Sequence, residues 1–335
     1  KRIDDINELN VKNNKIDFAW IEVTTKCNLF CVHCYDMASP FETHIMEPEV
    51  YKKVCNFIKQ NEIKRIQFIG GEPLLGGEAL KNMIYKIKAD VEFIEVFTNA
   101  TMIDGAWASF FAENNIHVAV SVYSYRADEH DRVTSVKGSH MRTNKGIRYL
   151  VEYGVKYRVC NVLIKNIRIG ECNTELYKIN EQKDVVRMIG RANRHLLSRE
   201  LLLKKVITRE RFSMPLNLKL TRNILSGHNC FGHKLYIATN GDVYPCVMER
   251  RWKYGNIDEE YQKTLECVQA QKVEGSKEEI DGCKICEFRY TCFDCRPDSL
   301  DNDLFAKPWY CSYHPENGMW EDLNVFVDKL LKNLE

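Results

Sequence analysis

Short apolar runs alternate with amphipathic stretches over the first half of the chain. The runs contain few polar residues, which is typical of strands that are covered on both faces; they lie at 18–24, 66–69, 93–97, 116–122 and 156–163. Between them the sequence favours helices, over 47–58, 78–89, 104–113 and 140–153. This alternation predicts parallel βαβ units and therefore an α/β fold.

The pattern changes in the second half. Residues 187–211 are strongly basic with interleaved leucines, and we interpret them as a helix with a solvated basic face; a docking surface for an acidic peptide is the alternative. An apolar strand at 234–238 precedes Thr239-Asn240-Gly241-Asp242, a hairpin turn of the Asn-Gly type. The following segment is rich in turns and cysteines. We therefore divide the chain into a linker at 1–16, an α/β domain at 17–214, a cysteine-rich domain at 225–316 and a C-terminal amphipathic helix at 317–335.

Composition narrows the class of protein. The 335 residues include 48 basic and 47 acidic side chains, so the net charge of +1 predicts neither a nucleic-acid partner nor an anionic membrane surface. No apolar run reaches the ~18–20 residues of a membrane span. The 14 cysteines fall into two spaced groups, which favours metal binding in a reducing compartment over a secreted disulfide scaffold. We expect the cytoplasm.

The first group is Cys27, Cys31 and Cys34, on a loop that leaves the first strand. Three thiolates at this spacing can hold one face of a four-iron cluster. Such a cluster needs four ligands, so one iron stays open for a small molecule. Tyr35 follows the third cysteine directly. The alternative is a zinc site completed by His33 or a distant cysteine.

Further motifs end the next three strands. Gly70-Gly71-Glu72-Pro73 follows the second strand, Asn99 follows the third, and Ser121 lies in the fourth. In α/β barrels the active site lies at the carboxyl ends of the strands, so these residues are candidate ligand contacts. The alternatives are a tight glycine turn and helix caps.

The second cysteine group lies in the C-terminal third of the chain and in the hairpin before it. Its members are Cys230, Cys246, Cys283, Cys286, Cys292, Cys295 and Cys311. Two Cys-x2-Cys pairs within the group also fit a zinc ribbon, which is the alternative to iron–sulfur binding.

The Cys-x3-Cys-x2-Cys-aromatic signature resembles the radical S-adenosylmethionine (SAM) superfamily. The second cysteine group resembles the SPASM extension of radical SAM enzymes that modify peptides. The resemblance implies a partial (β/α)6 TIM-like barrel with a C-terminal cysteine-rich iron–sulfur (SPASM) domain. It also implies SAM and three 4Fe–4S clusters, one that binds SAM and two that are auxiliary.

Carried over by position, the resemblance assigns roles to individual residues. Tyr35 lies beside the adenine, Gly70, Gly71 and Glu72 meet the methionine amine, and Asn99 and Ser121 contact the ribose or the carboxylate. Cys283, Cys286, Cys292 and Cys311 hold the outer auxiliary cluster, and Cys230, Cys246 and Cys295 hold the inner one with an open iron. Two residues separate Cys292 from Cys295 where the family has three, and no cysteine lies between Cys230 and Cys246, so this partition stays open.

The resemblance implies that the enzyme abstracts a hydrogen atom from a ribosomally made peptide and oxidatively forms a thioether or a similar crosslink. A low-potential donor of the flavodoxin or ferredoxin type would supply the electron. The alternatives are formylglycine formation as in anaerobic sulfatase maturation, peptide epimerisation, and a non-catalytic zinc or iron–sulfur binding protein. The formylglycine family has Asp immediately after the cysteine matching Cys246, where this chain has Val247.

Overall fold

A computed structural model describes most of the chain, and its described residues are 16–169, 184–213, 221, 224, 228, 231, 234–257 and 276–332. Two predictions fall on residues outside this set. These are the linker at 1–16, apart from Ile16, and the cluster ligand at Cys230.

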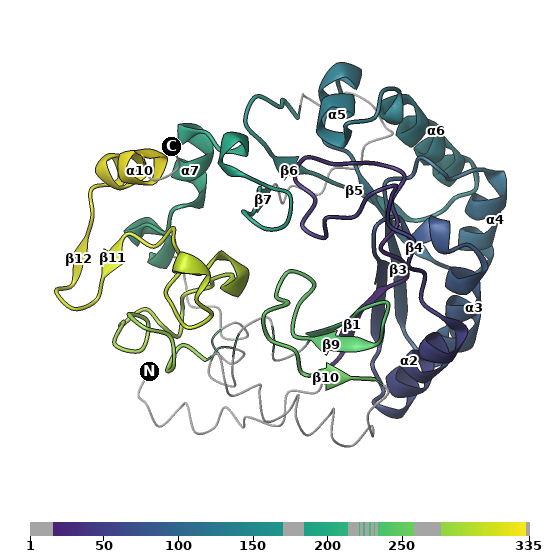
Figure 1. Cartoon of the computed structure of the whole chain (residues 1–335), viewed down its shortest axis with the longest axis horizontal. Helices are drawn as coiled ribbons and strands as arrows, with labels where there is room; N and C mark the ends of the chain where they lie inside the picture. Colours follow the sequence, from purple (N-terminus) through teal and green to yellow (C-terminus); the bar gives the residue numbers. More distant parts are fainter. Residues whose placement is uncertain are drawn as a thin grey trace.

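An eight-stranded sheet forms the centre of the molecule, in the order β10-β9-β8-β1-β2-β3-β4-β5 (Figure 1). Strands β1 to β5 and β8 pair in parallel, whereas β9 and β10 extend one edge in antiparallel. The architecture is a partial TIM-like barrel, as the sequence predicted. The strands span Phe18–Glu22 (β1), Arg65–Ile69 (β2), Phe93–Thr98 (β3), His117–Ser121 (β4), Tyr157–Cys160 (β5), Lys234–Ile237 (β8), Asp242–Tyr244 (β9) and Gly255–Asn256 (β10).

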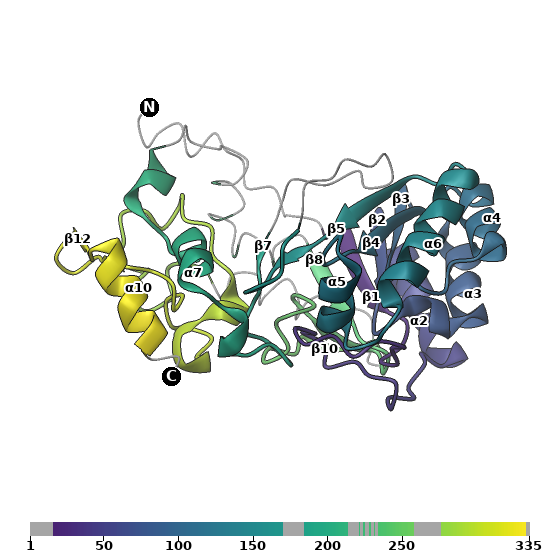
Figure 2. The ribbon, with the colours of Figure 1, turned by 90° about the horizontal axis from the view of Figure 1, so that it is seen from above.

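Helices cover the outer face of this sheet, on the right in Figures 1 and 2. Their apolar sides pack with alternate strand residues, such as Ala19 and Ile21 of β1, into the largest buried core. The helix predicted at 47–58 begins with Pro48, where a missing N–H costs no hydrogen bond. The helices of this half are Pro48–Gln60 (α2), Glu78–Ile87 (α3), Gly105–Glu113 (α4), Ala127–Thr134 (α5) and Ser139–Glu152 (α6).

The inner face of the sheet carries a smaller apolar cluster, which we call the inner cluster. Its buried members are Ile69, Tyr236 and Val247, and Trp20 is among the residues that pack against them. Because strand side chains alternate between faces, Glu22 lies on the same face as Trp20. The inner face of β1 thus ends in a buried carboxylate.

The remaining described elements are short. They span Val162–Leu163 (β6), Asp184–Val185 (β7), Arg199–Lys205 (α7), Tyr313–His314 (β11), Met319–Trp320 (β12) and Leu323–Lys332 (α10), with single 3₁₀ turns at 73–76, 194–196, 209–212, 296–298 and 300–302. Helices α7 and α10 pack together through Leu201, Leu202, Phe326 and Val327. The C-terminal helix begins at Leu323. A β-hairpin of β11 and β12 precedes it, which the sequence pattern did not indicate.

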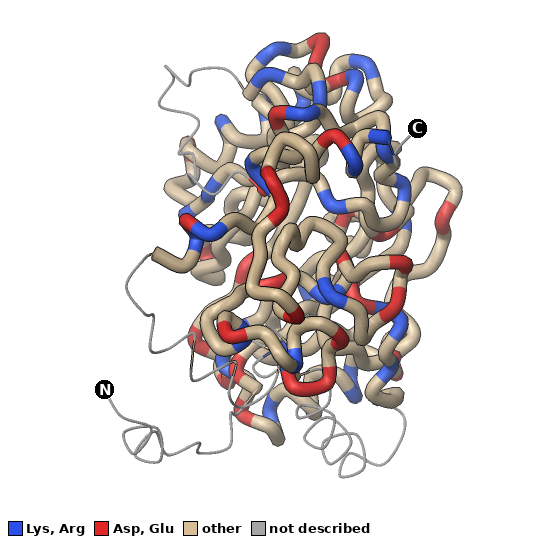
Figure 3. The backbone as a smooth tube through the Cα atoms, turned by 90° about the vertical axis from the view of Figure 1, so that its left-hand side faces the viewer, with Lys and Arg blue, Asp and Glu red and all other residues tan. Residues whose placement is uncertain are grey.

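The sheet continues across the boundary that the sequence suggested at residue 225. Strand β8 pairs with β1 over Phe18–Ile21, so the hairpin of β8 and β9 belongs to the barrel sheet. Figure 3, which views the molecule from the left-hand side of Figure 1, shows basic and acidic residues interspersed along the described backbone. Within the described part of the chain, no helix is both long and apolar enough to span a bilayer.

Candidate active site

The three cysteines of the first group lie close enough together to influence one another electrostatically. Burial raises the pKa of both Cys27 and Cys31. Hydrogen-bond donors face the sulfur atoms nevertheless: the Leu29 amide lies 3.4 Å from Cys27 Sγ, and backbone amides of Asp36 and Ala38 face Cys34. Such donors stabilise thiolates, which is the state that binds metal.

Gly70 and Gly71 lie directly against the segment that leads into the cysteine loop. The Gly71 amide donates to the Thr24 carbonyl at 2.8 Å, and the Glu72 amide donates to the Lys26 carbonyl at 2.8 Å. A Cβ at Gly71 would lie 2.2 Å from the Lys26 carbonyl oxygen, and one at Gly70 would lie 2.3 Å from that of Thr24. The glycines are required by this close backbone approach, which links the end of β2 to the loop after β1.

Glu72 joins the ends of β2 and β3. Its carboxylate accepts from the Thr98 hydroxyl at 2.6 Å and from the backbone amides of Asn99 and Leu74 at 2.8 and 3.1 Å. Burial raises the pKa of Glu72 to about 7, and these donors oppose that shift. Asn99 in turn donates to the Asn28 side chain at 2.8 Å and points its amide at Cys27 Sγ, 3.9 Å away. Two of the sequence-predicted residues are thereby connected to the first cysteine.

Ser121 reaches the second cysteine through a residue that sequence reasoning missed. The Tyr123 hydroxyl accepts from Ser121 and donates to Cys31 Sγ. The Tyr123 ring lies 4.6 Å from that of His33 and 5.5 Å from that of His130, centroid to centroid. An aromatic residue two positions after a strand-end serine is a weak sequence signal, because only the fold brings it to the cysteine loop.

A second missed residue, Arg191, holds the cysteine loop from the other side. Its guanidinium donates to the carbonyls of Cys31, Met37 and Ala38 at 2.7–2.9 Å and lies 3.7 Å from the centroid of the Phe30 ring. The backbone amide of Arg191 donates to the Cys34 carbonyl at 2.9 Å. The prediction that 187–211 forms one helix with a solvated basic face was therefore wrong, since Arg191 bonds the cysteine loop and only 199–205 is α-helical.

Tyr35 packs against the inner cluster, where Cys246 packs as well. Asp36, the next residue, pairs with Arg250 and lies beside Glu22. Burial, followed by the charge of Glu22, raises the pKa of Asp36 to about 7. The loop after the third cysteine thus connects the barrel interior with the segment after β9.

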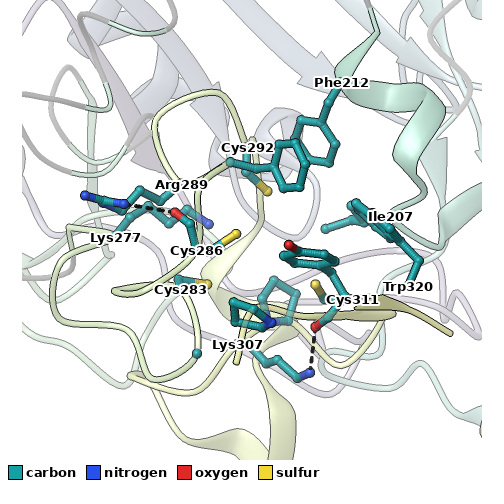
Figure 4. Close-up of a pocket in the computed structure, with 15 residues that line it drawn as sticks. Ile207, Phe212, Lys277, Cys283, Cys286, Arg289, Cys292, Lys307, Cys311 and Trp320 are labelled. Carbon is teal, nitrogen blue, oxygen red and sulfur yellow. Dashed lines mark hydrogen bonds between the residues drawn. The ribbon is translucent and has the colours of Figure 1, made fainter. Parts of the chain in front are cut away.

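Four cysteines of the second group line one pocket in the C-terminal region. Figure 4 shows Cys283, Cys286, Cys292 and Cys311 around a common space, with Phe212 and Trp320 at its side. Zinc would draw four thiolates to about 2.3 Å from one ion. Among the described residues, no three Cys, His, Asp or Glu groups converge in that way. Four cysteines around one space are the donor set of a four-iron cluster, with one thiolate on each iron.

Arg187 lies near both Cys246 and Cys295. It is the third site residue that the sequence did not identify. The positive charge of Arg187 lowers the pKa of Cys246, although burial raises it overall. The charge of Cys295 acts on Arg187 in turn. Arg187 also pairs with the buried Asp298 at 3.4 Å. A partly buried cation therefore lies near both described members of the predicted inner cluster site.

Known proteins resemble this chain in sequence and in fold. Residues 21–167, which contain all the strand-end motifs, match the family model described as the radical SAM superfamily. The subtilosin biosynthesis protein AlbA of Bacillus subtilis is 23% identical over 330 residues, which cover 91% of this chain and 72% of AlbA. Several other curated relatives match over about half of their own length.

Two solved structures share the fold. Native anSMEcpe with bound AdoMet superposes with a TM-score of 0.62 at 19% identity, over 95% of this chain and all of that one. Streptococcus suis SuiB bound to its precursor peptide SuiA superposes with a TM-score of 0.61 at 15% identity, over 88% of this chain and 74% of SuiB.

Residues 21–167 form a radical SAM domain, and over most of its length the chain is similar to radical SAM enzymes that modify peptides. It is an enzyme that uses SAM and a 4Fe–4S cluster, with auxiliary clusters in its SPASM region. The sequence had predicted this class and these cofactors.

Proposed function

We propose that this enzyme oxidatively crosslinks a ribosomally made peptide, with a thioether between a cysteine sulfur and a carbon as the favoured product. One observation carries the proposal. Tyr35, directly after the SAM-cluster cysteines, and Cys246, an expected auxiliary ligand, pack against the same inner cluster of the barrel. A peptide bound there would lie between the source of the radical and an acceptor for the remaining electron.

The cysteine sets fit the three clusters that the family implies. The first cluster would be held by Cys27, Cys31 and Cys34, whose sulfurs face hydrogen-bond donors. The pocket cysteines are assigned to the outer auxiliary cluster: Cys283, Cys286, Cys292 and Cys311. We assign Cys246 and Cys295, with Cys230, to the inner one. When bound and reduced, the first cluster and SAM supply a carbon-centred radical that removes a hydrogen atom from an unactivated C–H bond.

The strand-end residues would position SAM over the first cluster. The two glycines hold the end of β2 against the cysteine loop, and their backbone would meet the methionine amine of a SAM bound to that cluster. Glu72 keeps acceptor capacity for an ammonium group, since its two oxygens accept three hydrogen bonds out of about four. We retain Tyr35, Asn99 and Ser121 as SAM contacts as well; Asn99 and Ser121 are connected to cysteine sulfurs.

The chain's apolar groups around this position would exclude water from a reactive radical. Tyr236, Val247 and Ile69 are buried at the mouth of the barrel, and Tyr35 closes the same cluster. Val247 also argues against formylglycine formation, because the neighbour of Cys246 is an aliphatic side chain. A non-catalytic zinc protein is disfavoured by the match of residues 21–167 to the radical SAM family model.

Two partners follow from this chemistry. The substrate is a precursor peptide, the class of ligand bound by SuiB in the related structure. The electron donor would be a small low-potential protein of the flavodoxin or ferredoxin type. None of the eleven described cysteines forms a disulfide, which suits a reducing compartment, and we place the enzyme in the cytoplasm.

The test is co-expression of the chain with each short cysteine-containing peptide encoded beside its gene. A crosslink removes two hydrogens, so the peptide should lose about 2 Da, and tandem mass spectrometry should locate the bond. The matched control replaces Cys27, Cys31 and Cys34 by Ala and should leave every peptide unmodified. Formylglycine formation or epimerisation gives a different mass or none, and either result would replace the crosslink proposal.

A further inference from the structure

Two carboxylates meet in the barrel interior without a hydrogen-bond donor between them. Glu22 lies at the carboxyl end of β1 and Asp36 lies just after the cysteine loop. The side chains are 2% and 4% exposed, and they lie within hydrogen-bonding reach of each other. Glu22 Oε1 and Asp36 Oδ2 both lack a hydrogen-bond partner. Two buried carboxylate oxygens are therefore open to a donor from a bound ligand.

The remaining oxygens of the pair are held in place. Glu22 Oε2 accepts from the Thr239 backbone amide at 3.0 Å, in the turn between β8 and β9. Arg250 hydrogen-bonds to Asp36, lies 3.7 Å from Glu22 Oε1, and stacks 4.8 Å from the centroid of the Tyr236 ring. One guanidinium thus faces two carboxylates. The buried hydroxyl of Tyr236 also has no hydrogen-bond partner.

The other buried carboxylates of the barrel interior are differently placed. Glu95 receives both arms of the Arg158 guanidinium at 2.7 Å, together with the amide of Gln67, so its charge is fully paired. Glu72 accepts three hydrogen bonds from the ends of β2 and β3. Glu22 differs from both carboxylates. It is buried, and its Oε1 atom has no hydrogen-bond partner. Tyr35, Tyr236 and Arg250 lie near it, which places it next to the proposed substrate site.

We propose that Glu22 is the base that takes the substrate thiol proton in crosslink formation, with Asp36 and Arg250 as positioning residues. The inference rests on the proposed function. In the balanced reaction the substrate loses its C–H hydrogen atom to the SAM-derived radical, which becomes 5′-deoxyadenosine. It also loses its S–H proton to Glu22 and one electron to an oxidised auxiliary cluster, and the C–S bond forms.

The experiment uses the reconstituted holoenzyme, SAM, dithionite and the peptide that loses 2 Da on co-expression. It counts 5′-deoxyadenosine and crosslinked peptide in parallel. Wild type should form the two in a ratio near one. Glu22→Gln keeps an acceptor for the Thr239 amide, so iron content and 5′-deoxyadenosine formation should stay within about threefold of wild type. Its crosslinked product should fall about 100-fold, the lower range for loss of a general base.

Glu95→Gln is the matched control, because it removes a buried carboxylate from the same face of the barrel and should leave the ratio near one. A Glu22→Gln enzyme that crosslinks with the wild-type ratio would overturn the assignment, even if its KM for the peptide rises. If no peptide loses 2 Da on co-expression although the wild-type enzyme cleaves SAM, the proposed function itself fails, and the base assignment falls with it.

Discussion

The roles of single residues at the cysteine loop depend on contacts between positions that are far apart in the sequence. Gly71 is there because a side chain would overlap the Lys26 carbonyl, and Tyr123 matters because its hydroxyl reaches Cys31. The sequence identified the glycine as part of a motif and gave no reason to choose the tyrosine. The difference is physical: a repeated motif is visible in one dimension, whereas a hydroxyl–sulfur contact requires the barrel to close.

Replacing Gly71 by Ala should displace the start of the cysteine loop. The added methyl group lies 2.2 Å from a backbone oxygen that cannot move away freely, so we expect about 1–3 kcal/mol of destabilisation and loss of the first cluster. Iron analysis and thermal unfolding measure the two effects. Gly154→Ala is the control: its φ of +67° makes alanine costly for stability as well, but nothing lies within 4 Å of the added Cβ, so it should keep its iron. Equal iron loss in both variants would contradict the explanation.

Tyr123→Phe should shift the midpoint potential of the first cluster to a more negative value. Hydrogen bonds to cysteine sulfur stabilise the more electron-rich reduced state, and the variant removes one from Cys31. An EPR-monitored redox titration measures the shift. Ser121→Ala should give a smaller change in the same direction, and the exposed Tyr85→Phe should give none. An unaltered potential in Tyr123→Phe would show that the contact has no electronic effect.

At the scale of elements, the strands were predictable and some of their partners were not. Apolar runs located β1 to β5, and the turn Asn240-Gly241 located the hairpin of β8 and β9. That β8 pairs with β1 could not be inferred, because about 216 residues separate Phe18 from Lys234 and no local pattern encodes strand neighbours. The same limit applies to the segment around Arg191. Its basic composition indicated exposure to solvent, but the Arg191 guanidinium binds carbonyls of the cysteine loop.

Arg191→Met should weaken the hold on the first cluster without unfolding the barrel. The variant removes the donors to three loop carbonyls, while the backbone bond to Cys34 stays. We expect the first cluster to be lost at least severalfold faster to an iron chelator, as followed by its absorbance. Arg194→Met replaces an exposed arginine of the same segment and should lose iron at the wild-type rate. Identical rates in the two variants would contradict the assigned role.

At the scale of the whole molecule, the barrel and the SPASM region are joined by buried charges. Asp298 is 1% exposed and pairs with Lys205 at 2.9 Å and with Arg187 at 3.4 Å. The sequence predicted both cysteine groups and the class of enzyme, because ligand spacing is local. It did not predict this junction, since Arg187 and Lys205 precede Asp298 by about a hundred residues.

Asp298→Ala should destabilise the protein by about 3 kcal/mol, because it leaves Lys205 and the partly buried Arg187 without their shared, buried carboxylate. Equilibrium denaturation of the enzyme measures the loss. Lys204→Ala breaks a salt bridge between exposed residues, Lys204 and Glu200, and should cost less than about 1 kcal/mol. Equal costs would mean that the junction contributes no more than a surface ion pair.

The iron content and the SAM cleavage of the reconstituted protein distinguish a radical SAM enzyme with three clusters from a zinc protein. Anaerobically reconstituted protein is analysed for iron, then reduced with dithionite in the presence of SAM, and 5′-deoxyadenosine is counted. We predict about twelve irons per chain, four in each of three clusters. Replacing Cys27, Cys31 and Cys34 by Ala should remove about four irons and abolish cleavage. Replacing the four pocket cysteines should remove about four irons and leave cleavage in place. Stoichiometric zinc with intact SAM would contradict the account.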